Sequence, residues 1–63
     1  MWTVIYICNT RQHADNIKKI LTKEGFLVKV EPISKGNAEG TCEILVPSAE
    51  AEECYLVLFD HGF

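Results

Sequence analysis

The sequence predicts a single small two-layer α+β domain with the element order strand–helix–strand–strand–helix. Its 63 residues are 48% hydrophobic and 24% charged, a composition typical of globular proteins. Segments with the apolar alternation of strands are interspersed with segments whose apolar residues recur at helical spacing. A chain of this length buries only about 60% of the surface that its unfolded form exposes. We therefore expect one domain, residues 1–63, that needs further support from disulfides, a metal or a partner subunit.

The first strand and the first helix are predicted from residue type and spacing. Residues 2–8 are β-branched, aromatic or apolar almost throughout, which favours a strand. Asn9 is the predicted N-cap of the next helix, and Gln12 can reach back to its amide in a capping box. Gly25 is expected to end this helix, so that Phe26 packs back on the last turn. The helix face predicted to be buried contains Ala14, Ile17, Ile20 and Leu21.

Two further strands and a second helix are predicted for the rest of the chain. Residues 26–33 and residues 41–46 each alternate in the manner of half-buried strands, and the polar loop 34–40 joins them into a hairpin. Pro47 ends the second of these strands, and Ser48 is the predicted N-cap of the last helix. The buried face of that helix is expected to contain Ala51, Cys54, Tyr55 and Leu58.

The connections restrict how these elements can be arranged. We expect the sheet order first–third–second strand, with the third strand antiparallel to both neighbours. The segment between the first two strands places its helix on one sheet face, and the last helix returns to the same face. The predicted architecture is a βαββα sandwich, which is the ferredoxin-like βαββαβ plan without its last strand.

The first strand has apolar side chains on both sides. Strict alternation places Ile5 and Ile7 on one side, whereas Trp2, Val4, Tyr6 and Cys8 occupy the other. The predicted topology also leaves this strand at a sheet edge, where an exposed apolar surface favours aggregation unless it is covered.

We expect a second copy of the chain to cover the first strand, with an interface formed by Trp2, Val4 and Tyr6. The two copies would either pair edge to edge or stack their open faces. A strand of another protein that completes the sheet is the alternative partner. The remaining alternative is that residues 59–63 fold back over the strand within one molecule.

The cysteines indicate a reduced core rather than a disulfide framework. Cys8, Cys42 and Cys54 are three in number and form no C-x-x-C pair, which favours free thiols and a cytoplasmic location. Cys8 and Cys42 are expected to be cross-strand neighbours, which leaves a redox or metal sensor open as an alternative. We favour the structural interpretation because free cysteine is among the most buried residue types. His13 and His61 do not add a spacing typical of zinc sites, so we expect no metal.

Two further segments are candidate ligand sites. The loop residues Lys35, Gly36, Asn37 and Gly40 lie between strands rather than before a helix, so they lack the context of a phosphate loop. This loop is still the longest irregular segment and the best candidate for contacting a small-molecule effector. Asn9 and Arg11, at the start of the first helix, are a candidate anion site.

The sequence does not predict an enzyme. Glu50, Glu52 and Glu53 cluster at a helix start, where carboxylates complement the helix dipole. We find no arrangement of a nucleophile and a base, and the chain is too short to enclose a large cofactor, so we expect no catalytic residues and no cofactors.

Charge and hydropathy exclude other classes of partner. The net charge is −3, which disfavours nucleic-acid binding because phosphate contacts supply most of that affinity. Residues 9–33 have a net charge of +2 and residues 34–63 a net charge of −5. No segment approaches the roughly 20 apolar residues of a membrane span, so we expect no membrane partner.

Several of these features together resemble a known family. These features cover nearly the whole chain, and they are Val4, Tyr6, Asn9, Ala14, Ile17, Leu21, Glu24-Gly25, Val46-Pro47 and the acidic second helix. In them the chain is similar to the short prokaryotic signal-transducing proteins, which have a PII-like, ferredoxin-like fold. The resemblance implies a small regulatory or effector-binding module, usually oligomeric, and brings no catalytic residues. The long nucleotide-binding loop of true PII regulators is missing from this sequence.

Overall fold

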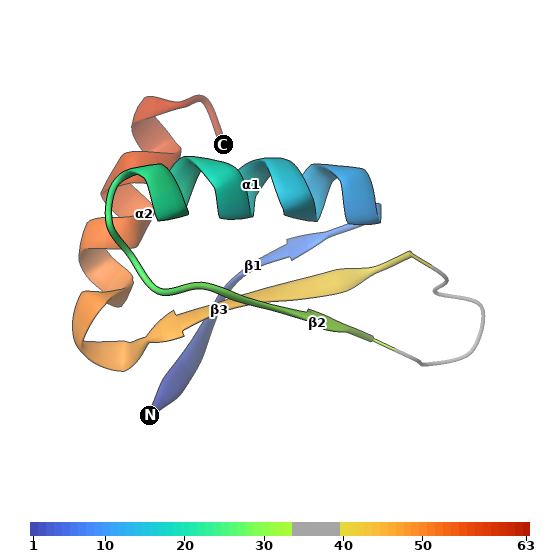
Figure 1. Cartoon of the computed structure of the whole chain (residues 1–63), viewed down its shortest axis with the longest axis horizontal. Helices are drawn as coiled ribbons and strands as arrows, with labels where there is room; N and C mark the ends of the chain where they lie inside the picture. Colours follow the sequence, from blue (N-terminus) through green and yellow to red (C-terminus); the bar gives the residue numbers. More distant parts are fainter. Residues whose placement is uncertain (34–39) are drawn as a thin grey trace.

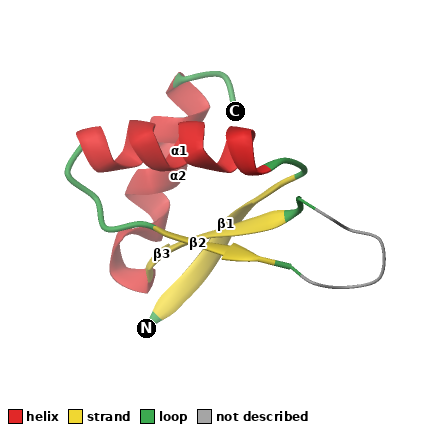
Figure 2. Cartoon of the chain, turned by 45° about the vertical axis from the view of Figure 1, so that its right-hand side comes forward, coloured by secondary structure: helices red, strands yellow, loops and turns green. Residues whose placement is uncertain are grey.

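The structure is a computed structural model that describes residues 1–33 and 40–63. Three strands form one sheet in the order β1-β3-β2, and β3 is antiparallel to both neighbours, as the sequence predicts. Both helices pack on the same side of this sheet, and α2 crosses the direction of α1 (Figures 1 and 2). The elements are β1 (Trp2–Cys8), α1 (Arg11–Lys23), β2 (Lys29–Pro32), β3 (Cys42–Pro47), the 3₁₀ turn η1 (Ser48–Glu50) and α2 (Ala51–Asp60).

Helix α1 begins one residue later than the sequence predicts. Thr10, not Asn9, is the N-cap: its backbone is extended, and its Oγ1 accepts a hydrogen bond from the His13 amide at 3.1 Å. The prediction of Asn9 was wrong because Asn9 and Thr10 are both good N-caps, and position along the chain cannot rank them. The last helix also differs, because η1 precedes it. Ser48 caps no helix with its side chain, and its Oγ donates to the Met1 carbonyl instead.

Both helices end with the same Gly-Phe pair. In α1, the Phe26 amide donates to the Leu21 carbonyl at 3.0 Å, and Gly25 adopts a φ of +94°. In α2, the Phe63 amide donates to the Leu58 carbonyl at 3.0 Å, with a φ of +89° at Gly62. These bonds define the Schellman motif, which returns the chain onto the last helical turn. The predicted end of α1 at Gly25 is confirmed.

The core lies between the helices and one face of the sheet. The predicted helix face of α1 is confirmed for three of its four residues, because Ile20 is only half-buried. In α2, Cys54 and Leu58 are buried as predicted, but Tyr55 is exposed and Val57 is partly buried in its place. The buried residues are Ile5, Cys8, Ala14, Ile17, Leu21, Cys42, Ile44, Val46, Cys54 and Leu58.

Backbone hydrogen bonds explain why Pro32 is tolerated in β2. The Ile33 amide donates to the Thr41 carbonyl at 2.9 Å, so this pair is hydrogen-bonded. Antiparallel pairs alternate, so the next pair, Pro32 opposite Cys42, is not hydrogen-bonded, and the nitrogen of Pro32 points to the open edge of the sheet. Strand β2 is therefore an edge strand, and it is shorter than the predicted residues 26–33.

A β-bulge in β1 changes which side chains face the helices. The pairing shifts by one residue between Val4 and Tyr6, so Ile5 is the extra residue. As a result Ile5, Tyr6 and Cys8 lie on the helix side, whereas Trp2, Val4 and Ile7 lie on the outer side. The prediction from strict alternation was wrong for Tyr6, Cys8 and Ile7, because an inserted residue reverses the alternation beyond it.

The two candidate caps of α1 can be separated by mutation. We expect Thr10→Ala to lower the free energy of unfolding by about 1 kcal/mol, because the His13 amide loses its acceptor. Asn9→Ala is the matched control and should change it by less than about 0.5 kcal/mol. Urea denaturation followed by circular dichroism measures both. An equal loss in the two variants would contradict the assignment of the cap to Thr10.

Candidate functional site

Exposed apolar side chains lie on both sides of the sheet beside the open edge of β1. On the outer side of the sheet, Trp2 and Val4 are each 40% exposed and Ile7 is 56% exposed. Neither helix covers this side, because both pack on the opposite one (Figure 2). Two of the three predicted interface residues, Trp2 and Val4, therefore lie on one uncovered surface. The third, Tyr6, lies on the helix side because of the bulge.

The outer side of the sheet becomes polar away from β1. The Lys29 ammonium lies 4.8 Å from the centre of the Trp2 ring, a cation–π contact that spans the central strand. Glu31 of β2 lies directly opposite Glu43 of β3. Like charges in this position repel each other, so this part of the sheet favours contact with water.

On the helix side, the edge of β1 borders an apolar hollow of 280 Å³. Its walls combine one strand residue with residues of α2 and of the segment that follows: Tyr6, Tyr55, Leu56, Leu58, Phe59 and Phe63. Three of these are large apolar residues that α2 leaves open to solvent, with exposed fractions of 53% for Tyr55, 62% for Leu56 and 76% for Phe59. We call these three residues the α2 flank. Phe59 follows Leu56 by three residues and Tyr55 by four, which places the three side chains on one side of the helix.

The end of the chain partly covers β1 from this side. The Phe63 ring packs edge-to-face against Tyr6 at 6.1 Å and lies 5.3 Å from the His13 ring, both measured between ring centres. We predicted, as an alternative, that residues 59–63 fold back over the first strand. Of this segment, the Phe63 side chain does so. The prediction is not realised for Phe59, which is exposed, or for the outer side of β1.

The backbone of β1 also presents free hydrogen-bonding groups at its edge. The Ser48 amide donates to the Met1 carbonyl at 2.8 Å, so Met1 and Ser48 form a hydrogen-bonded pair. Alternation along the register then directs the amides and carbonyls of Trp2 and Val4 away from β3, and beyond the bulge that of Ile7. No strand of residues 1–33 or 40–63 pairs with this edge.

The predicted cross-strand pair of cysteines is present. Cys8 lies directly opposite Cys42 in the β1–β3 register, and their exposed fractions are 1% and 2%. Burial, and to a smaller extent the charge of Cys42, raises the pKa of the Cys8 thiol. The Cys42 thiol donates to the Gly40 carbonyl at 3.6 Å. Buried, protonated thiols are poor nucleophiles and poor metal ligands, which supports the structural interpretation.

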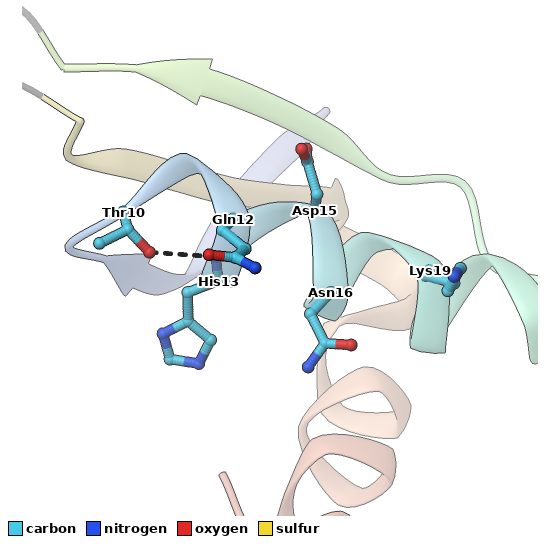
Figure 3. Close-up of a pocket in the computed structure, with 6 residues that line it drawn as sticks. All are labelled: Thr10, Gln12, His13, Asp15, Asn16 and Lys19. Carbon is cyan, nitrogen blue, oxygen red and sulfur yellow. Dashed lines mark hydrogen bonds between the residues drawn. The ribbon is translucent and has the colours of Figure 1, made fainter.

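A second hollow, of 500 Å³, lies along α1 and is less suited to binding. Among the described residues, its walls come from the N-cap and one helix: Thr10, Gln12, His13, Asp15, Asn16 and Lys19. Asp15 points to the opposite side of the helix from His13 and Asn16, so the side chains diverge rather than converge on one point (Figure 3). A binding site needs a second wall, which the part of the chain that the structure describes does not supply here.

The other predicted site residues lie near the start of α1 or outside the described residues. Asn9 and Arg11, the candidate anion site, flank the N-cap, and the Arg11 Nε donates to the Asp15 carboxylate at 3.1 Å. Lys35, Gly36 and Asn37 lie outside the described residues. Gly40 is described: it has a φ of +89°, and a side chain there would approach the Asn9 carbonyl to 3.4 Å. The end of the predicted ligand loop therefore lies against the connection between β1 and α1.

Sequence patterns did not identify the α2 flank. The prediction placed Tyr55 on the buried face, and it assigned Leu56 and Phe59 to no face. A signal was present, because Tyr55, Leu56 and Phe59 follow one helix side that the buried residues Cys54 and Leu58 do not share. Among the described residues, no group of three or more histidine, cysteine, aspartate or glutamate side chains is placed to hold a metal ion. Neither α1 nor α2 has the length and apolar character to cross a bilayer.

Comparison with protein-family models, with curated proteins and with solved structures gives no match for this chain.

The buried thiols predict a loss of stability at alkaline pH. Burial, with smaller contributions from Glu50 and Glu53, raises the pKa of Cys54, as burial does for Cys8. Unfolded thiols ionise near their ordinary pKa of 9.0, whereas these two stay protonated in the folded chain. The stability that the two buried thiols contribute to the folded chain is fully present below pH 9.0. We therefore expect the free energy of unfolding to fall as the pH rises through that value.

Urea denaturation at a series of pH values from neutral to alkaline measures this dependence. The variant Cys54→Ala should be less stable at neutral pH but should show a shallower decline. An identical slope in the variant and the parent chain would show that Cys54 does not contribute.

Proposed function

We propose that this chain is a small regulatory or binding module that acts as a homo-oligomer assembled around β1, and that it is not an enzyme. The single observation that carries the proposal is the state of β1. It is a seven-residue sheet edge without a charged side chain, and apolar residues are exposed along it. An edge of this kind favours association with another chain.

The small size of the domain supports the same proposal. Of the residues in 1–33 and 40–63, ten are buried and eight large hydrophobic residues are exposed. Small domains commonly gain the stability that their own core cannot supply by association. The ferredoxin-like plan without its last strand, the PII-like signalling family and the cytoplasmic location are part of this proposal. They rest on the strand order and on the sequence resemblance.

A partner protein that completes the sheet is the alternative occupant of the same surface. A sensor function of Cys8 and Cys42 is less well supported, because both thiols are buried and the pKa of Cys8 is raised. For a small-molecule effector, the hollow beside Tyr6 is more apolar than the hollow along α1. We place the homo-oligomer first because the surface around β1 extends over both sides of the sheet, farther than a small molecule reaches.

Light scattering coupled to size-exclusion chromatography tests the proposal. We expect the chain to have at least twice its 7.1 kDa mass at high micromolar concentration and to dissociate on dilution. Val4→Lys should shift this equilibrium toward the monomer, because it places a charge on the outer side of β1. Leu27→Lys is the matched control: Leu27 is 68% exposed, and it lies outside β1 and α2, so the mass should not change.

A parent chain that remains a monomer at high micromolar concentration would contradict the homo-oligomer. If that monomer instead captures one other protein in a stoichiometric complex that Val4→Lys abolishes, the sheet-completing alternative would replace it.

A further inference from the structure

We infer that two copies of the chain join edge to edge, β1 against the β1 of the second copy, with the two α2 flanks packed together across the twofold axis. The inference rests on the proposed homo-oligomer and specifies its geometry. It excludes a dimer in which the two outer sheet sides stack. The occupant of the hollow beside Tyr6 is then the α2 flank of the second copy.

Two independent features of the chain lie beside the same edge. The backbone groups of Trp2, Val4 and Ile7 point away from β3 along that edge. The hollow on the helix side contains Tyr6 of the same strand and all three residues of the α2 flank. A partner that supplies only a strand covers the backbone, and a small ligand fills only the hollow. A second copy presents a strand edge and an apolar helix flank together, so it covers both.

The charges are compatible with self-association. No charged residue occurs between Trp2 and Cys8, and the α2 flank includes no charge among its three residues. Glu52 lies on the same helix side, three residues before Tyr55. With the twofold axis perpendicular to α2, the two helices run antiparallel, so the two Glu52 carboxylates lie at opposite ends of the contact. Like-charge repulsion therefore does not oppose this arrangement.

Stacking of the outer sides is less favourable. It would enclose the Glu31–Glu43 pair, and both carboxylates would lose water while they face a like charge. It would also leave Tyr55, Leu56 and Phe59 exposed, because these lie on the other side of the sheet. Edge pairing keeps the two glutamates in water and covers the flank.

The apolar area is close to what a dimer needs. Phe, Tyr and Trp side chains bury about 150–250 Å² each. With the same range as an upper guide for the smaller Val4, Ile7 and Leu56, the exposed fractions of Trp2, Val4, Ile7 and the α2 flank leave at most roughly 600 Å² of apolar surface beside this edge. A standard interface buries about 800 Å² per partner, a sum that neighbouring polar atoms can complete.

The bulge determines how the interface is divided between backbone and side chains. The outward backbone groups fall at Trp2 and Val4 before the bulge and at Ile7 after it, so a regular ladder cannot run along the whole strand. Backbone pairing is therefore short, and the α2 flank contributes most of the buried apolar area. Removing the flank should consequently have a larger effect than any single change on the outer side.

Substitution on the α2 flank is the first test. Phe59→Glu should raise the dimer dissociation constant by at least about 30-fold, the effect of losing an interface hot spot. Phe59 is 76% exposed, so the change leaves the core intact, which circular dichroism and thermal unfolding of the monomer verify. Leu27→Glu, an equally radical change at an exposed leucine outside the flank, should leave the constant within about threefold.

Amide hydrogen exchange measured by NMR is the second test, and it reads the edge directly. The amides of Val4 and Ile7, which flank the bulge, should be protected in the dimer and should lose that protection in Phe59→Glu. The Tyr6 and Cys8 amides, which pair with β3, should stay protected in both and serve as internal controls.

The outcomes distinguish this inference from the proposed function. A chain that is monomeric at high micromolar concentration overturns both. A dimer that Val4→Lys dissociates and Phe59→Glu does not, with fast exchange at Val4 and Ile7, overturns edge pairing and leaves the homo-oligomer standing. Dissociation by both variants, with protected edge amides, supports the inference.

Discussion

The structure depends on the packing of one face of β3 against the two helices. Strand β3 is the only described strand with a hydrogen-bonded neighbour on each side, and Cys42, Ile44 and Val46 on its inner face are all buried. Against that face lie Ala14, Ile17 and Leu21 of α1 and Cys54 and Leu58 of α2. The ten buried residues among those described all belong to this one cluster. The positions of both outer strands follow from this central contact.

The edge of β1 is open because the described sheet has three strands and none of them lies beyond β1. Strand β2 forms the other edge, and it is only four residues long and contains Pro32, so it offers little for a further strand to pair with. Strand β1 is seven residues long, contains no proline and has exposed apolar side chains. The two edges of one small sheet thus differ in their capacity to associate. This difference between the edges is the physical basis for proposing the interface at β1 rather than at β2.

Much of the fold could be predicted because local signals agreed with the tertiary structure. The helical spacing of Ala14, Ile17 and Leu21 identified the inner face of α1, and Gly25 identified its end. The strand order followed from chain connectivity, and the pairing of Cys8 with Cys42 followed from the strand order. Errors occurred where two local solutions had similar energies. Asn9 and Thr10 are both good caps, and Tyr55 borders the buried face of α2, so its spacing alone does not decide whether it is covered.

The sequence by itself determined the element types, their order and the apolar character of β1, because these depend on side-chain chemistry and on periodicities within one segment. Only the tertiary structure decided which side chains of β1 face the helices. The extra residue at Ile5 reverses the alternation, and an insertion of this kind is defined by the register with β3, which lies more than thirty residues away in the chain. The α2 flank became visible for the same reason. A helix residue is exposed or buried according to what lies beside it, and beside Tyr55, Leu56 and Phe59 lies the open edge of β1.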